Sequence, residues 1–175
     1  MHRVPDLIAQ NVQYLDQALA LGGRLDREVW TARGPGFEHG PVGTQVRHVL
    51  DHYSCFLAGW VERHVDYDGR ARDARIEADP AHAAACLVRI KQGLAGLRGE
   101  AGDSELTVTQ DDPRDPPARV VTTLARELQV LTSHTIHHFA VIGLILRTLD
   151  VPVDRNFGVA PSTLVYCTKV PGVAR

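Results

Sequence analysis

Two histidines in the C-terminal half are spaced so that they could share one metal ion. His134 and His138 are four residues apart, in a run whose apolar positions recur at helical spacing. Side chains at this separation lie about 5–6 Å apart at Cβ on one helix face, and helical zinc motifs use it. Thr135 follows the first histidine, so the H-E-x-x-H pattern with its built-in general base is absent. The pair alone fits equally well two core histidines bonded to neighbouring polar groups.

A second histidine cluster lies more than 80 residues earlier, where His48 and His52 are also four residues apart. A catalytic metal site commonly takes three protein ligands and leaves one position for water or substrate. Two histidines from the later cluster and one from the earlier would give that number. His48 lies off the main apolar stripe of its helix and His52 nearer the edge, so His52 is the fallback ligand or a fourth one.

Four helices are expected to position these side chains. Apolar residues recur at helical spacing, and proline or glycine breaks the pattern between the segments. Thr123 is a plausible N-cap for the helix that carries the later cluster, which continues to the break at Pro152. The expected helices span about 5–32, 41–64, 80–98 and 123–151.

The connections differ in character. Asp66 to Asp79 is dense in alternating charge, which predicts a solvated crossover rather than a core element. Leu106 to Val121 has the alternation and turn residues of a small β-hairpin before the last helix. The segment from Asp154 onward is expected to pack a turn or short helix across the others. The prediction is an all-α four-helix bundle with a long crossover, forming a single domain over residues 1–175.

Two segments resemble a known family. The run from Val42 to Asp51 resembles the second-helix motif of the DinB-like (damage-inducible) family, and His134-Thr135-Ile136-His137-His138 resembles that family's H-x-x-x-H. The resemblance implies a four-helix bundle, frequently dimeric, that binds a divalent metal ion, zinc or nickel first and iron or manganese next. It assigns the ligands to His48, His134 and His138. Phe139-Ala140-Val141 departs from the family's polar Arg-Gly-Gln-like run, so the usual polar wall on that side is not expected.

Composition limits the partners and the compartment. The 175 residues carry a net charge of -2, which gives no basic surface for nucleic acid. The three cysteines are far apart, which argues against a disulfide framework and a thiolate zinc site and favours the reducing cytoplasm. No run approaches the roughly 18 consecutive apolar residues of a membrane span. We therefore expect a cytoplasmic protein with no nucleic-acid or membrane partner.

Other polar residues near the clusters receive smaller roles. His137 points away from the stripe, and Asp51 is expected to face solvent. Glu127 lies two turns before His134, roughly 10 Å along the axis, and is expected to be a buried ion-pair partner. Cys55 is expected to be a small core residue.

The remaining charged residues are assigned to the surface. Three histidines are isolated in the sequence and expected to be superficial: His39, His64 and His82. The arginines of the charged connection are either solvated or, if that segment covers the site, able to bind an anionic substrate: Arg70, Arg72 and Arg75.

Three functions remain open at this stage. The first is a metal-dependent enzyme that transfers a thiol to small electrophiles or hydrolyses a substrate, with a low-molecular-weight thiol as the leading small-molecule substrate, as relatives in the family suggest. The second is a non-catalytic, stress-associated metal-binding protein. The third is a metal-free bundle with core histidines. The alanine-rich and glycine-broken stripes of the first and third helices predict a homodimer.

Overall fold

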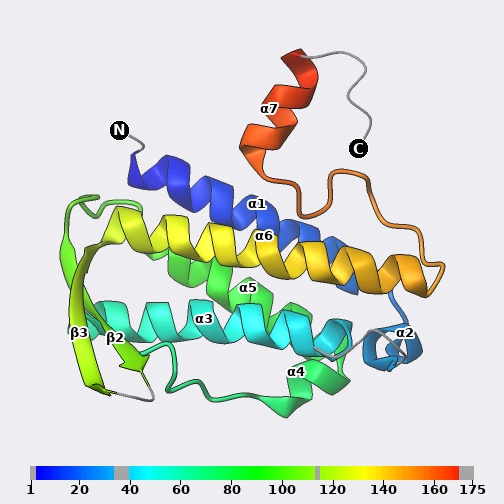
Figure 1. The fold of residues 1–175 in the computed structure, drawn as a ribbon, viewed down its shortest axis with the longest axis horizontal. Coiled ribbons are helices and arrows are strands. Elements are labelled where there is room, and N and C mark those ends of the chain that lie inside the picture. The colour runs from blue at the N-terminus through cyan, green and yellow to red at the C-terminus, as the bar shows by residue number, and fades with distance from the viewer. Residues whose placement is uncertain (1–2, 34–39, 113–114, 170–175) are drawn as a thin grey trace.

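The computed structural model describes residues 3–33, 40–112 and 115–169, and these form a mainly helical fold with a small sheet (Figure 1). The long helices are α1 (Val4–Gly22), α3 (Val42–Glu62), α5 (Pro80–Gly96) and α6 (Leu124–Thr148). The short ones are α2 (Arg27–Thr31), α4 (Ala74–Ala78) and α7 (Pro161–Lys169). The strands are β1 (His64–Val65), β2 (Glu105–Asp112) and β3 (Asp115–Thr123).

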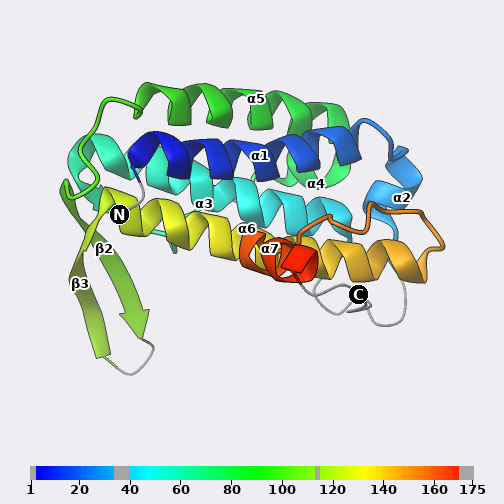
Figure 2. The same cartoon turned by 90° about the horizontal axis from the view of Figure 1, so that it is seen from above.

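The four long helices share one hydrophobic core. α1 packs against α5 and α6, and α3 packs against the same two helices (Figures 1 and 2). The predicted apolar stripes therefore face inward, and the largest fully buried side chains come from several of the helices, including Tyr53, Phe56, Leu87, Leu128 and Phe139. Burial of these side chains supplies the main driving force for assembly.

The expected first helix over 5–32 is wrong in its second half. α1 ends at Gly22, and the chain starts a separate short helix, α2, after Asp26. The Asp26 carboxylate accepts a hydrogen bond from the backbone N–H of Val29 (2.8 Å), which is an N-cap interaction that favours a new helix start. Trp30 of α2 is buried, which explains why an apolar residue occurs in this short second helix.

The charged connection over Asp66–Asp79 is also more structured than expected. It contains α4, in which Ile76 is buried, and α4 packs against α3 and α5. The indole Nε1 of Trp30 donates a hydrogen bond to the Ile76 carbonyl oxygen (3.1 Å), so α2 and α4 are tied together at the end of the molecule away from the hairpin (Figure 1). Burial of Ile76 and this hydrogen bond thus hold α4 against the core, although the surrounding run is charged.

The predicted hairpin before the last helix is confirmed. β2 and β3 pair antiparallel from Glu105–Thr123 outward, with an irregularity between Gln110 and Asp112. β1 adds in parallel to β2, giving the order β1-β2-β3. β3 leads directly into α6, and Thr123 caps that helix by accepting from the Arg126 N–H (3.3 Å), as the sequence indicated.

α6 is long and apolar enough, by length and composition, to cross a membrane. The core helix of a globular fold meets the same criteria, and here α6 packs against α1 and α3. α7 projects away from the long helices instead of packing across them as expected (Figure 1), and none of its residues is buried. The segment before it is held to α1 because the Tyr14 hydroxyl donates to the Val159 carbonyl oxygen (2.9 Å).

Candidate metal centre

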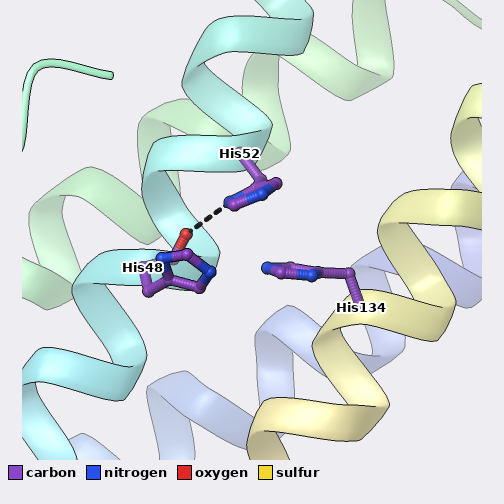
Figure 3. A group of neighbouring side chains, drawn as sticks. All are labelled: His48, His52 and His134. Carbon is purple, nitrogen blue, oxygen red and sulfur yellow. Dashed lines mark hydrogen bonds between the residues drawn. The ribbon is translucent and has the colours of Figure 1, made fainter. Parts of the chain in front are cut away.

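Four histidines from two helices converge in the interior between α3 and α6. The imidazole rings of His48 and His134 have centroids 4.9 Å apart, and the His138 centroid lies 4.5 Å from each of them. His52 stacks on His134 with a centroid separation of 3.8 Å. Figure 3 shows His48 and His52 reaching from α3 toward His134 on α6. The two sequence clusters therefore form one spatial cluster, because α3 and α6 are packed neighbours.

The nitrogens of this cluster are close enough to surround one ion. One ligand atom from each of His48, His52 and His134 lies within 4.8 Å of the other two. The sequence assigned the site to His48, His134 and His138 and kept His52 in reserve. The structure brings all four side chains together, and the three ligand atoms within 4.8 Å of one another include one from His52, the residue kept in reserve.

Hydrogen bonds orient two of the imidazoles. His52 Nδ1 lies 2.9 Å from the His48 carbonyl oxygen, and His138 Nδ1 lies 2.7 Å from Oε1 of Gln45. Both acceptors are oxygens, so each Nδ1 carries the proton and donates. The Nε2 atom then holds the lone pair that binds a metal, which is the usual arrangement of metal-binding histidines whose other nitrogen donates to an oxygen.

His134 has the most informative environment. Its Nε2 is buried and has no hydrogen-bond partner among the described residues. A buried polar atom without a partner costs free energy, on the order of 1–3 kcal/mol, and such atoms are uncommon in folded proteins. A metal ion bound at Nε2 would satisfy it, so the donor set fits an ion on structural grounds.

Burial keeps the histidines neutral. It is the main cause that lowers the pKa of His48 to about 3, with further lowering from the neighbouring His138 and His52. The pKa of His134 is lowered to about 2 by burial and then by the other three histidines of the cluster, chiefly His52 and His138. Burial also lowers the pKa of His52. Neutral imidazoles at neutral pH are ready to coordinate, because protonated histidine cannot.

A buried hydrogen-bond network fixes the two helices beside the cluster. The Tyr53 hydroxyl donates to Oδ1 of Asn11 (2.7 Å) and lies 3.2 Å from Oγ1 of Thr135. Asn11 in turn donates to the carbonyl oxygens of Leu7 and Leu128. Tyr53 and Thr135 are the residues next to His52 and His134, so the network sets the spacing of α1, α3 and α6 at the level of the site.

Sequence reasoning missed the contribution of Tyr67. This aromatic residue follows β1, and its ring stacks on His52 with a centroid separation of 5.4 Å. Its hydroxyl donates to Oε2 of Glu127 (2.7 Å), and burial followed by the Glu127 charge raises the pKa of Tyr67. Glu127 is buried as expected, but its described partners are the hydroxyls of Tyr67 and Thr122 rather than a cation. The sequence signal for this role was an aromatic residue, Tyr67, within the otherwise charged connection over Asp66–Asp79.

The charged connection does approach the site. Tyr67, three residues before Arg70, stacks on His52, and the positive charge of Arg70 contributes to lowering the pKa values of His48 and His52. Its Nε is buried without a hydrogen-bond partner among the described residues. Of the two readings offered for these arginines, the one in which the segment covers the histidines is supported for Arg70.

A buried ion pair lies on the other side of His48. Arg47 pairs through Nη1 with Asp51 and through Nε with Glu77 of α4, and its side chain is only 13% exposed. Asp51 was expected to face solvent, but it is buried because Arg47 neutralises it. The Thr44 hydroxyl also donates to Glu77 (2.9 Å). These contacts fix a cation beside the histidine cluster.

The cluster opens to a cavity of about 270 Å³. Its walls are formed by residues of α3 and α6: Thr44, Gln45, Arg47, His48, His137, His138 and Val141. Two of the clustered imidazoles and the Arg47 guanidinium thus border a space large enough for several water molecules or a small organic group.

The other predicted positions fall in several places. His137 is exposed, as expected, and half-buried Cys55 packs against the core. His64 was expected to be superficial but is half-buried, and its two ring nitrogens lie 2.8 and 3.0 Å from the hydroxyls of Thr107 and Thr109. His82 is half-buried and bonded to Asp73, so its expected surface position is also wrong. His39 lies outside the described residues.

Comparison with known proteins adds little. No family model matches the chain, and no solved structure matches it. FK506-binding protein 5 of Rhizopus delemar is 30% identical over 107 residues, which are 60% of this chain. The aligned part spans only 28% of that relative's length. A match over so small a share of the relative does not assign the chain to its family.

Proposed function

We propose that the histidine cluster binds one divalent metal ion, zinc or nickel first and iron or manganese next. The observation that carries the proposal is the buried Nε2 of His134, which lies among three further imidazoles and has no hydrogen-bond partner in the described part of the chain. The sequence also left open that His52 replaces His48. The His48 ring lies 4.9 Å from the His134 ring, so the proposal keeps His48 and His134 as ligands. His138 and His52 compete for the third position, or both join them.

We also propose that the long helices form a four-helix bundle of the DinB-like type. The support is the motif resemblance over Val42–Asp51 and His134–His138, together with the mutual packing of α1, α3, α5 and α6. The crossover of such a bundle corresponds here to the segment between α3 and α5, which supplies Tyr67 and Arg70.

The function that the site supports best is a metal-dependent enzyme, a thiol transferase or hydrolase acting on a small molecule. A bound divalent ion with an open position lowers the pKa of a coordinated thiol or water toward neutrality. Within the chain, the cavity bordered by His48 and His138 gives a small substrate room beside the proposed metal position. Gln45 and the His48 carbonyl oxygen hold two imidazoles in fixed orientations.

Metal analysis tests the binding proposal first. The chain, purified without a histidine tag, should contain about one equivalent of zinc, nickel, iron or manganese that a chelator removes. Activity is then assayed with a panel of low-molecular-weight thiols and electrophiles, before and after metal removal. Activity that survives complete metal removal, or inactivity with every pair, would remove the enzyme proposal. Absence of metal binding would favour a metal-free helical protein with core histidines.

A non-catalytic, stress-associated metal-binding protein is the alternative. It is favoured by one specific observation, that four imidazoles rather than three lie together. Four protein ligands would close the coordination shell of a tetrahedral ion, as in structural sites, whereas three leave a position for substrate. X-ray absorption spectroscopy of the loaded protein separates the cases by the number of nitrogen ligands.

We further propose that the chain forms a homodimer in the cytoplasm. The apolar side chains exposed on α3, α5 and α6 include Val61, Val88 and Leu144. Light scattering should therefore return about twice the 19.2 kDa of one chain. A mass of one chain at micromolar concentration would contradict the dimer.

A further inference from the structure

A second group of metal-ligating side chains lies outside the histidine centre. His82 and Cys86 are four residues apart on α5, so they share one helix face. Asp73 is the N-cap residue of α4, and α4 packs against α5. None of the three belongs to the cluster between α3 and α6.

The three donor atoms converge on one point. His82 Nε2 lies 2.8 Å from Asp73 Oδ2 and 3.8 Å from Cys86 Sγ. One ligand atom from each residue lies within 4.8 Å of the other two. Bond lengths of about 2.0–2.3 Å around a tetrahedral zinc ion place its ligand atoms roughly 3.3–3.6 Å apart. A shift of about half an ångström in the carboxylate would therefore admit an ion.

The same geometry argues against a nucleophilic triad. In such triads the nucleophile and the carboxylate bond to opposite nitrogens of the imidazole. Here Cys86 and Asp73 both approach Nε2 of His82. Sulfur and oxygen on the same nitrogen is the arrangement expected of ligands that surround a common ion.

Neighbouring groups prepare two of the donors. Oδ1 of Asp73 accepts from the Arg75 backbone N–H (2.9 Å), which leaves Oδ2 directed at His82. Arg89 Nη2 donates a hydrogen bond to the Cys86 sulfur at 3.0 Å, which holds that sulfur in place. Cys86 is 9% exposed and the His82 side chain 14% exposed, whereas the Asp73 side chain is 38% exposed, so two ligands are shielded and the third faces solvent.

A cavity adjoins this group. It has a volume of about 540 Å³ and is lined by Asp73, Cys86 and Arg89 together with apolar side chains that include Leu50, Ile76 and Ile90. Three protein ligands leave a tetrahedral ion one further position. Water or a small ligand in the cavity can occupy that position.

We propose that Asp73, His82 and Cys86 form a second divalent-metal site, of the zinc type, whose open coordination position faces this cavity. A thiolate, an imidazole and a carboxylate are all established zinc ligands. The site is independent of the function proposed for the histidine centre, because it shares no ligand with it.

Cobalt substitution tests the site directly. Co²⁺ bound by a thiolate shows a near-ultraviolet charge-transfer band, which nitrogen ligands do not produce. We expect this band when Co²⁺ is added to the full-length, metal-free protein under reducing conditions, and Zn²⁺ should bleach it. Absence of the band would overturn the proposal, whatever the histidine centre binds.

Variants assign the band to its residue. Cys86→Ser and His82→Asn should each lose it, whereas the Cys55→Ser/Cys167→Ser double variant should keep it. His134→Ala should also keep it, which separates this site from the histidine centre. Loss of the band in the double variant, or its persistence in Cys86→Ser, would overturn the assignment. The double variant decides the matter even if Cys86→Ser does not fold.

Discussion

His138 Nδ1 lies 2.7 Å from Oε1 of Gln45, so a side chain of α3 fixes the orientation of an imidazole carried by α6. Gln45 is itself buried, at 3% exposure, and lies one turn before His48. The hydrogen bond keeps the proton of His138 on Nδ1 and leaves Nε2 as the ligand atom. Gln45 thus determines which nitrogen of His138 is left to bind the metal ion that we propose.

Replacing Gln45 by methionine should weaken metal binding without unfolding the protein. Methionine has a similar length but offers no oxygen acceptor, so His138 loses its fixed tautomer. Loss of such a supporting contact typically costs about 10–100-fold in metal affinity. Isothermal titration with Zn²⁺ measures the change. Gln45→Glu keeps an acceptor and should bind metal more tightly than Gln45→Met. Equal affinities for the wild type and Gln45→Met would exclude His138 as a ligand oriented in this way.

Alanine variants of the histidines should separate the ligands from their neighbours. His48→Ala and His134→Ala should each lose most of the bound metal, because each is central to the cluster. Combining the two should cost little more than either alone, since removal of one ligand already disables a shared site. Elemental analysis at neutral pH gives the occupancy. His137→Ala is the matched control, because His137 is adjacent in sequence but exposed.

The third position is decided by a direct comparison. Loss of metal in His138→Ala with retention in His52→Ala would support the ligand set that the family resemblance implies. The reverse result would mean that His48, His52 and His134 are the ligands and that His138 is not. Loss in both variants would indicate four ligands and favour a structural ion.

Periodicity located α3 and α6 from the sequence because both helices carry long apolar stripes that packing then buried. The paired clusters could therefore be expected to meet. Asp51 was misplaced because a helical wheel shows only its own helix, whereas its burial depends on Arg47 and, through that arginine, on Glu77 of another element.

The second metal group was missed for the same reason. His82 and Cys86 have helical i,i+4 spacing, which was a readable signal, but the third donor comes from a capping residue in the charged connection. The position of such a capping residue is determined by how its segment packs against other elements. The residue pattern of that segment alone does not show this packing. The break between α1 and α2 likewise depends on the Asp26 cap and on the site where Trp30 is buried.

The metal-free protein should lose stability as the pH falls from about 7 to about 5, before most carboxylates titrate. The folded-state pKa values of His48, His52 and His134 are lowered from 6.5. The unfolded chain therefore binds protons in this range that the folded chain does not. Stability is fully present above the unfolded value and declines as the pH falls toward the folded one.

Thermal unfolding in chelator at several pH values measures this decline. His134→Asn should flatten the dependence of the melting temperature on pH, because one of the depressed groups is removed. His137→Asn should leave the slope unchanged. An equally steep slope in His134→Asn would mean that burial of His134 does not contribute to acid sensitivity.

α3 and α4 approach each other closely at Gly43, and this position should not tolerate even a methyl group. A Cβ at this position would lie 2.3 Å from the Glu77 carbonyl oxygen and 2.5 Å from Nε1 of Trp30. Neither atom is the end of a flexible side chain, so α3 and α4 would have to separate. Gly43→Ala should therefore lower the free energy of unfolding by about 1–3 kcal/mol, the usual cost of overpacking, which exceeds the helix-propensity gain of up to about 1 kcal/mol.

Gly96 provides the matched control for that substitution. It is also a helical glycine, at the end of α5, but an added Cβ would meet no atom within 4 Å. Gly96→Ala should be neutral or stabilise the protein by up to about 1 kcal/mol. In urea denaturation, the unfolding midpoint of Gly43→Ala should be lower than that of the wild type. The midpoint of Gly96→Ala should be unchanged or higher. Equal midpoints would contradict the close approach of α3 and α4, on which the Arg47–Glu77 pair beside the metal centre depends.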